Sequence, residues 1–182
     1  MKKRCQWVNL NNPLYISYHD NEWGQPLYDE QKIYELFILE CFQAGLSWEI
    51  ILNKRAAFTK AFDNFDMHKI ASYNQDKINE LMNNADIVRN KLKIKACINN
   101  TKIILELKKK TSFADYLWQF TNYEIIYPEI HQTHNALSDT ISADLKKRGM
   151  HFVGTITIYA FLQAMGIINE HDKECYCYKK HR

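Results

Sequence analysis

The sequence predicts an all-α fold in a single compact unit. Apolar residues recur at helical spacing along most of the chain, and no segment sustains the alternation of a half-buried strand. Only five glycines and three prolines interrupt the 182 residues, and no low-complexity linker divides them. A chain of this length can bury a substantial core. We therefore expect one unit spanning residues 1–182, without an internal repeat.

Glycine and capping residues mark where the expected helices begin and end. Gly24 precedes the first helix, Gly45 can end it in a left-handed conformation, and Ser47 can cap the second. Gly149 and Gly154 separate the last two helices. In chain order, helices are expected at about 29–44, 48–60, 67–72, 75–83, 86–106, 112–121, 138–148 and 154–167.

Charge gives only a weak indication of a partner. The formal net charge is +3, so the chain lacks an overall basic character. Basic residues nevertheless gather in short runs, which are usually solvated faces and otherwise contact phosphate. These runs are Lys2–Arg4, Lys108–Lys110, Lys146–Arg148 and Lys179–Arg182.

The cysteine content indicates a reducing compartment. The five cysteines are odd in number, and Cys41 and Cys97 lie in apolar segments, which argues against a disulfide framework. No signal-peptide-like stretch follows the first four residues, and no segment approaches the length of a membrane span. We expect a soluble, cytoplasmic protein with no membrane partner. Nothing suggests an obligate oligomer, so a monomer is expected.

Two thiols and two imidazoles near the chain ends form a candidate metal site. Cys5 and His19 lie near the start, and His171 and Cys175 near the finish. Two cysteines with two histidines are a ligand set of closed structural zinc sites. His171 and Cys175 share one face of a helical turn, whereas the spacing of Cys5 and His19 is not a standard one. Chance placement therefore stays open, and Cys177 could replace Cys175. If the ligands meet, zinc joins the terminal segments, about 1–25 and 165–182.

Glu40 is the sharpest chemical anomaly of the sequence. A helix over 29–44 places it on a stripe with Ile33, Leu36, Phe37 and Ala44, and the opposite side is nearly as apolar. A buried charge requires a partner. That partner is either an internal cation or backbone donors, which would be an ordinary structural arrangement, or a ligand that hydrogen-bonds to the carboxylate.

The neighbours of Glu40 favour a binding pocket. The short run Gln43–Trp48 forms a tight corner after its helix, so Glu40 and Trp48 flank that corner. Four further aromatic residues, Trp7, Tyr15, Tyr18 and Trp23, gather in or near one polar segment upstream. Aromatic rings beside a carboxylate can stack a flat ring and read its polar edge. Ordinary core packing is the alternative explanation.

Several long runs together resemble one protein family. The sequence is similar to the bacterial 3-methyladenine DNA glycosylase I family, the constitutive alkylation-repair glycosylases. The resemblance extends from Cys5 to Tyr178 and includes all four candidate zinc ligands in the right order. The runs that carry it are Tyr15–Gly24, Gln43–Trp48, Leu145–Thr155 and His171–Tyr178.

This resemblance implies the all-α fold of the helix-hairpin-helix glycosylase superfamily. It also implies a structural Zn2+ that joins the two termini through Cys5, His19, His171 and Cys175. The helix-hairpin-helix region would span about 75–106. The sequence departs from the family at the hairpin, because 85–89 contains no glycine where many relatives are glycine-rich. The residues that could compensate as phosphate contacts are Arg89, Lys91 and Lys93.

The resemblance further implies roles for the pocket and the corner. Glu40 would contact a flipped base, with aromatic rings stacking on the base and shaping the pocket. The corner would insert into DNA near the lesion, with Leu46 as the wedge. The implied base-binding aromatic residues are Tyr18, Trp48, Trp7, Tyr15 and Trp23, and the implied DNA contacts of the corner are Gln43, Gly45 and Leu46.

The implied activity is excision of N3-methyladenine from double-stranded alkylated DNA, which leaves an abasic site. Methylation at N3 makes the base cationic, so the glycosidic bond is already activated and extrusion of the nucleotide becomes the main task. Glu40 would accept hydrogen bonds from the exocyclic amine edge and stabilise the cation. No aspartate closely follows the hairpin, and no lysine has the apolar setting of a nucleophile, so we expect monofunctional hydrolysis.

A non-catalytic protein is the alternative. A zinc-stabilised module that binds DNA or another partner needs only the terminal metal site and the basic runs. Glu40 discriminates between the two, because such a module has no need for a buried carboxylate surrounded by aromatic rings.

Overall fold

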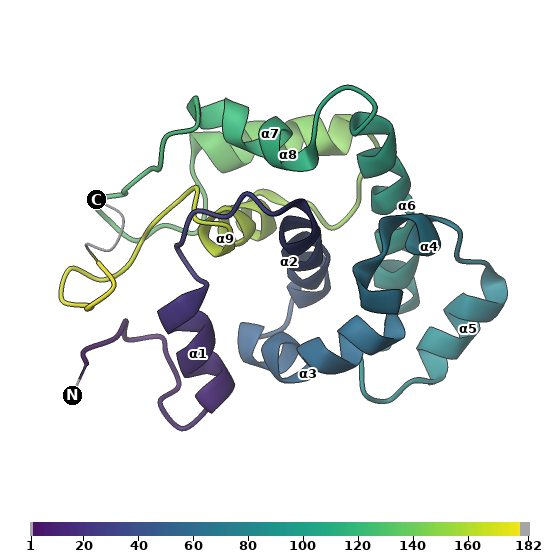
Figure 1. Ribbon diagram of the computed structural model, residues 1–182, viewed down its shortest axis with the longest axis horizontal. Helices are drawn as coiled ribbons and strands as arrows, with labels where there is room; N and C mark the ends of the chain where they lie inside the picture. The colour runs from purple at the N-terminus through teal and green to yellow at the C-terminus, as the bar shows by residue number, and fades with distance from the viewer. Residues whose placement is uncertain (1, 179–182) are drawn as a thin grey trace.

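A computed structural model describes residues 2–178, and over that range the regular structure is helical (Figure 1). Extended pairing in the described range is limited to an isolated bridge between Ile126 and Ile168. The basic run 179–182 predicted from the sequence lies outside the described residues. The all-α prediction is confirmed.

The helices follow the predicted order, with one additional helix and one helix that begins later than predicted. The α-helices are α1 (Pro13–Asn21), α2 (Glu30–Gln43), α3 (Trp48–Ala61), α4 (Met67–Ala71), α5 (Gln75–Asn83), α6 (Lys91–Leu107), α7 (Phe113–Trp118), α8 (Ala136–Lys147) and α9 (Thr155–Ala164). Two short 3-10 helices, η1 (Asp63–Phe65) and η2 (Gln119–Thr121), follow α3 and α7.

Helix α1 was not among the predicted helices. Pro13 occupies its first turn, where a missing N–H removes no intrahelical bond. The side chain of Asn12 caps the helix by accepting hydrogen bonds from the N–H groups of Leu14 and Tyr15, at 3.1 and 3.4 Å. This proline therefore begins a helix rather than marking a loop.

The helix predicted at 86–106 begins later, at Lys91. Asn90 caps it by accepting from the N–H groups of Leu92 and Lys93, at 3.0 and 3.1 Å. Residues 84–90 consequently form a loop between α5 and α6. The correction leaves a helix–loop–helix inside the predicted region 75–106.

Helix α2 is the centre of the core. Nine of its 14 residues are buried, on all sides of the helix, as expected for a helix that is apolar all round. It packs against α3, α6, α7 and α9. Any functional group that α2 carries inward is therefore held by a rigid and heavily packed support.

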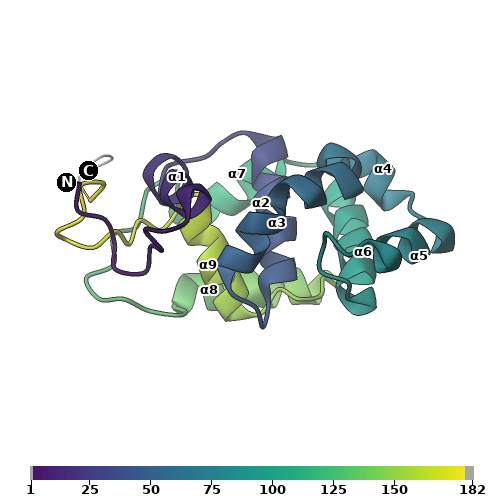
Figure 2. The same ribbon diagram turned by 90° about the horizontal axis from the view of Figure 1, so that it is seen from below.

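The two terminal segments lie together at one end of the molecule, and α4, α5 and α6 lie at the other (Figures 1 and 2). A main-chain hydrogen bond of 2.9 Å runs from the N–H of Tyr176 to the carbonyl oxygen of Lys3. The side chains of Lys3 and Glu174 form an ion pair beside it. None of the helices in residues 2–178 combines the length and the apolar character required to cross a membrane.

Candidate active site

A cavity of about 210 Å³ opens where α1, α2, α3 and α9 meet. Its volume lies below the range of about 300–1,000 Å³ that is typical for drug-sized ligands, so it suits a single small heterocycle. All six residues predicted to form a base pocket line it. The lining residues are Trp7, Tyr15, Tyr18, Trp23, Glu40, Gln43, Trp48, His131, Ala160, Gln163 and Glu170.

Helix α1 and the residues beside it supply most of the aromatic wall. Tyr15 and Tyr18 are three residues apart, so they share one face of α1. The ring of Tyr18 lies 5.1 Å from that of Trp48, across the gap to α3. Trp7 lies 5.4 Å from Tyr15 and 4.8 Å from Trp23. These are typical distances for packed aromatic pairs, and they leave flat surfaces around the cavity.

Glu40 lies in this wall and is only 3% exposed. Among the residues that the structure describes, no donor reaches its Oε2 atom. Burial alone raises the pKa of this carboxyl from 4.5 to about 8. The internal ion pair that the sequence left open is therefore not formed within the described range, and the raised pKa favours the protonated carboxyl at neutral pH.

A second polar atom of the cavity wall is also unsatisfied. The indole Nε1 of Trp48 is buried and has no acceptor among the described residues. Unpaired buried donors and acceptors are rare in folded proteins. One donor and one acceptor on two residues that line the same small cavity match a flat ligand that carries both kinds of group. A cationic ligand would in addition favour the ionised form of Glu40.

The corner between α2 and α3 projects from this wall. Gly45 has a φ of +79°, and no atom beyond its chain neighbours lies within 4 Å of the position that a Cβ would occupy, so this side of the turn is free of neighbouring packing. Ser47 caps α3 by accepting from the N–H of Ile50. Leu46, the predicted wedge, is 37% exposed at the tip of the corner, while Gln43 at its base lines the cavity.

The four predicted metal ligands also come together. One ligand atom from each of Cys5, His19, His171 and Cys175 lies within 4.8 Å of all the others, and all four residues are buried. The alternative thiol, Cys177, groups instead with His19 and Asp20, and its N–H donates to the sulfur of Cys175.

The surroundings of the cluster fix both imidazole rings. His19 Nδ1 lies 2.8 Å from Asp20, whose carboxylate is held by Arg4. His171 Nδ1 lies 3.0 Å from the side-chain oxygen of Asn169. Outer partners of this kind orient the other ring nitrogen towards a metal. The donor set, its burial and these partners fit a tetrahedral zinc ion.

The cluster supports one side of the cavity. The ring of Trp23 lies 4.7 Å from His171, and that of Trp7 lies 5.3 Å from His19. Gly24, with a φ of +71°, is required here because a Cβ atom would lie 2.7 Å from Cε1 of His171. The positions of the terminal segments therefore affect the shape of the aromatic wall.

A model of the methyladenine glycosylase family matches residues 7–178. The chain belongs to that family. It is 40% identical to DNA-3-methyladenine glycosylase 1 of Escherichia coli (strain K12), over 97% of each protein. A crystal structure of 3-methyladenine DNA glycosylase I superposes with a TM-score of 0.93 at 40% identity, covering 97% of this chain and 100% of that one. A structure of the Staphylococcus aureus enzyme, solved for its recognition of 3-methyladenine, gives a TM-score of 0.92 at 34% identity and covers 98% of both chains.

Of the three DNA contacts predicted in the helix–loop–helix, two are exposed and one is buried. Arg89 and Lys91 are exposed on the loop and at the start of α6. Lys93 is buried instead, and its ammonium donates to two main-chain carbonyl groups. The phosphate contact predicted for Lys93 is therefore not supported by its position, because burial and internal bonds withdraw the charge from the surface.

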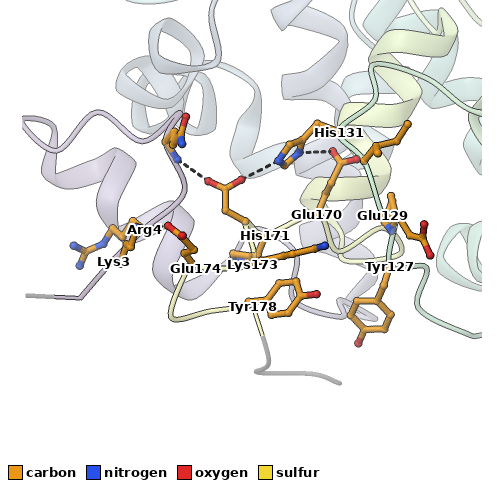
Figure 3. A pocket seen from close by; sticks show the side chains of 14 residues that line it. Lys3, Arg4, Tyr127, Glu129, His131, Glu170, His171, Lys173, Glu174 and Tyr178 are labelled. Atoms are coloured by element: carbon orange, nitrogen blue, oxygen red, sulfur yellow. Dashed lines mark hydrogen bonds and ion pairs between the residues drawn. The ribbon is translucent and has the colours of Figure 1, made fainter.

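Three polar cavity residues were missed by the sequence reasoning. Glu170 is buried and accepts from Tyr159 at 2.8 Å and from Gln163 at 2.6 Å. The ring of His131 is largely exposed, but it pairs with Glu170 and with Asp172 (Figure 3). The sequence offered one indication for Glu170, which directly precedes the candidate metal ligand His171. Nothing in the sequence pairs His131 with either carboxylate, because the loop that carries it is irregular.

Proposed function

We propose that this protein excises 3-methyladenine from alkylated double-stranded DNA by hydrolysing the N-glycosidic bond. The observation that carries the proposal is the unpaired Glu40 carboxyl in a small aromatic cavity. A non-catalytic module has no use for a carboxyl kept buried without a partner, since that arrangement destabilises the fold. The presence of this buried carboxyl indicates that a ligand completes the site.

In this proposal the flipped base stacks between aromatic rings. Tyr18 and Trp48 supply the stacking faces, and Trp7, Tyr15 and Trp23 complete the wall. The exocyclic amine of the base donates to Glu40. The Oε2 atom of Glu40 then has a partner.

The cationic substrate reduces what the protein must do chemically. The methylated base is a good leaving group because it departs as a neutral molecule. Positive charge beside Glu40 lowers the pKa of its carboxyl from about 8, so the ionised form stabilises the damaged base. Water then attacks C1′ of the sugar and leaves an abasic site.

The reaction is proposed to be monofunctional. Within the described part of the chain, no lysine lines the cavity. Lys93, a buried lysine of α6, has its ammonium engaged by main-chain carbonyl oxygens. Neither arrangement provides a free amine to attack the sugar. Borohydride trapping of a covalent protein–DNA adduct would contradict this part of the proposal.

We also propose how the protein holds DNA. The corner with Gln43, Gly45 and Leu46 would enter the duplex beside the lesion, and the free projection of this corner supports that role. The helix–loop–helix of α5 and α6 would act as the family's helix-hairpin-helix, with Arg89 and Lys91 against the phosphate backbone.

A structural zinc ion is the proposed cofactor. Cys5, His19, His171 and Cys175 would hold it, and the buried cluster with its oriented imidazoles supports this assignment. Zinc bound there would close the terminal segments against each other and take no part in the reaction. A cytoplasmic location and a monomeric state stay predictions.

The direct test is incubation of the protein with methylated DNA that contains both N3-methyladenine and N7-methylguanine. Chromatography of the released bases is expected to show 3-methyladenine with little 7-methylguanine. The matched control is Glu40→Gln, which is expected to bind DNA but to release base slowly. Folded, zinc-loaded wild-type protein that releases neither base would favour the non-catalytic module.

A further inference from the structure

Lys93 differs from its neighbours on the same helix. Lys91 and Lys95 are exposed, whereas Lys93 is 7% exposed. Its Nζ atom lies 2.7 Å from the carbonyl oxygen of Phe42 and 2.6 Å from that of Ala44. A buried ammonium that keeps its charge requires such partners, and charge-assisted bonds of this length are strong.

The two carbonyl groups belong to the end of α2. The last turn of a helix leaves carbonyl groups without intrahelical donors, and it carries partial negative charge. Ala44, the C-cap residue, is extended with a ψ of 114°. The Lys93 ammonium therefore caps α2 from a different helix, at the point where the chain turns into the corner.

The corner has little other support. Residues 45–47 are exposed, and nothing packs within 4 Å of the position a Cβ of Gly45 would occupy. A main-chain bond of 2.6 Å from Leu46 to Gln43 is internal to the turn. Lys93 thus ties the base of the corner to α6 through two hydrogen bonds.

A third segment meets the same side chain. The Lys93 ammonium lies 5.8 Å from the centroid of the Phe152 ring. The adjacent residue His151 is held on α6 by two hydrogen bonds between its main chain and the side chain of Asn100, at 2.8 and 2.9 Å. The corner, the start of α6 and the segment around 149–154 therefore converge on one buried charge.

We infer that Lys93 is a positioning residue that locks the corner to the helix–loop–helix. The loop's hold on the phosphate backbone and the insertion of Leu46 into the duplex then act as one rigid unit. This inference rests on the proposed function. It assigns Lys93 to extrusion of the nucleotide, and not to phosphate binding or to recognition of the base.

The test compares Lys93→Met, which keeps an apolar stem without donors, with Lys93→Arg, which can donate to both carbonyl groups. Lys95→Met, an exposed lysine on the same helix, is the matched control. Three quantities are measured: single-turnover excision from duplex DNA at saturating protein, affinity for free 3-methyladenine, and the salt dependence of DNA binding.

Lys93→Met is expected to slow single-turnover excision by about 10- to 100-fold, because small misplacements of a positioned group have effects of this size. Base affinity is expected to change less than about twofold, and the salt slope is expected to stay unchanged. Lys93→Arg should recover most of the rate. The loss should also shrink when the lesion faces an abasic-site analogue, since extrusion then requires less unpairing. Lys95→Met should leave the single-turnover rate unchanged.

Three results have distinct meanings. A salt slope reduced by about 0.9 in Lys93→Met would make Lys93 a phosphate contact and overturn the inference. Equal losses of base affinity and rate, without rescue by arginine, would reduce Lys93 to a purely structural role and would also overturn it. Wild-type protein that releases no base refutes the proposed function itself. Should Lys93→Met fail to fold, Lys93→Gln, which keeps one donor group, serves the same comparison.

Discussion

Replacing Glu40 with glutamine is expected to stabilise the protein while removing its activity. The raised pKa means that the folded protein holds a proton which the unfolded chain has lost. The two states differ in bound protons at pH values between the ordinary pKa of 4.5 and the folded pKa of about 8. Wild-type stability therefore falls as pH rises through that window. Glutamine resembles the protonated carboxyl and carries no such dependence.

The magnitude follows from the two pKa values. Their difference, at about 1.36 kcal/mol for each pKa unit, corresponds to about 5 kcal/mol well above pH 8. The same relation predicts that the free energy of unfolding of Glu40→Gln exceeds that of the wild type by about 1 kcal/mol near pH 5 and by about 4 kcal/mol near pH 8. Urea unfolding of both proteins at these two pH values, at a fixed zinc concentration, measures this difference.

Other titrating groups occur in both proteins, so their contributions to the free energy of unfolding cancel in the comparison. Glu124→Gln makes the same exchange of a carboxyl for an amide at an exposed glutamate and is the matched control. Base release by Glu40→Gln should fall far more than DNA binding. An advantage that is equal at both pH values would refute the reasoning, since it would mean that the Glu40 carboxyl ionises in the folded protein as readily as in the unfolded chain.

Four further predictions follow from the same geometry. Because the ionised form of Glu40 is required, kcat/KM for excision by wild-type protein should rise with pH and level off above about 8, and a flat profile would contradict that requirement. Trp48→Ala removes one of the two stacking faces, so affinity for free 3-methyladenine, measured by titration calorimetry, should fall by about 5- to 150-fold, the effect of losing one base–aromatic stack. Gly24→Ala places a methyl group 2.7 Å from the His171 ring, so zinc affinity in a chelator competition should fall by about 10- to 100-fold; unchanged affinity would argue against the cluster as the metal site. Cys175→Ser should mainly lower the thermal unfolding temperature, and a stable, metal-free and fully active variant would refute the zinc site.

The sequence predicted most of the pocket but not the state of its central residue. Glu40 and five aromatic residues were identified from their concentration and from the resemblance to a family, and all six line one cavity. Whether Glu40 had an internal partner could not be predicted, because that depends on which side chains surround it from other helices. The structure answers this question for the described residues and also adds Gln163 and Glu170 to the wall.

Local pattern was informative where a single segment decides the structure. Helices α2 and α3 and the glycine corner between them follow from apolar spacing and capping residues, which act over a few positions. Helix α1 was not predicted and α6 was predicted to begin too early, even though Pro13 and Asn90, at the starts of these helices, act locally. A proline can begin a helix as well as interrupt one, and an asparagine cap within a helical pattern is easily overlooked.

By itself the sequence determined the helical class, the pocket residues and the candidate metal ligands, because residue type and spacing limit what each short segment can form. Only the tertiary structure decided what distant groups do to one another. It brings Cys5 and His19 beside His171 and Cys175, and it leaves Glu40 without a partner. It also turns Lys93 from a predicted surface charge into an internal cap of α2. The physical reason is that burial and pairing of a charge depend on residues far away in the chain, which local spacing does not encode.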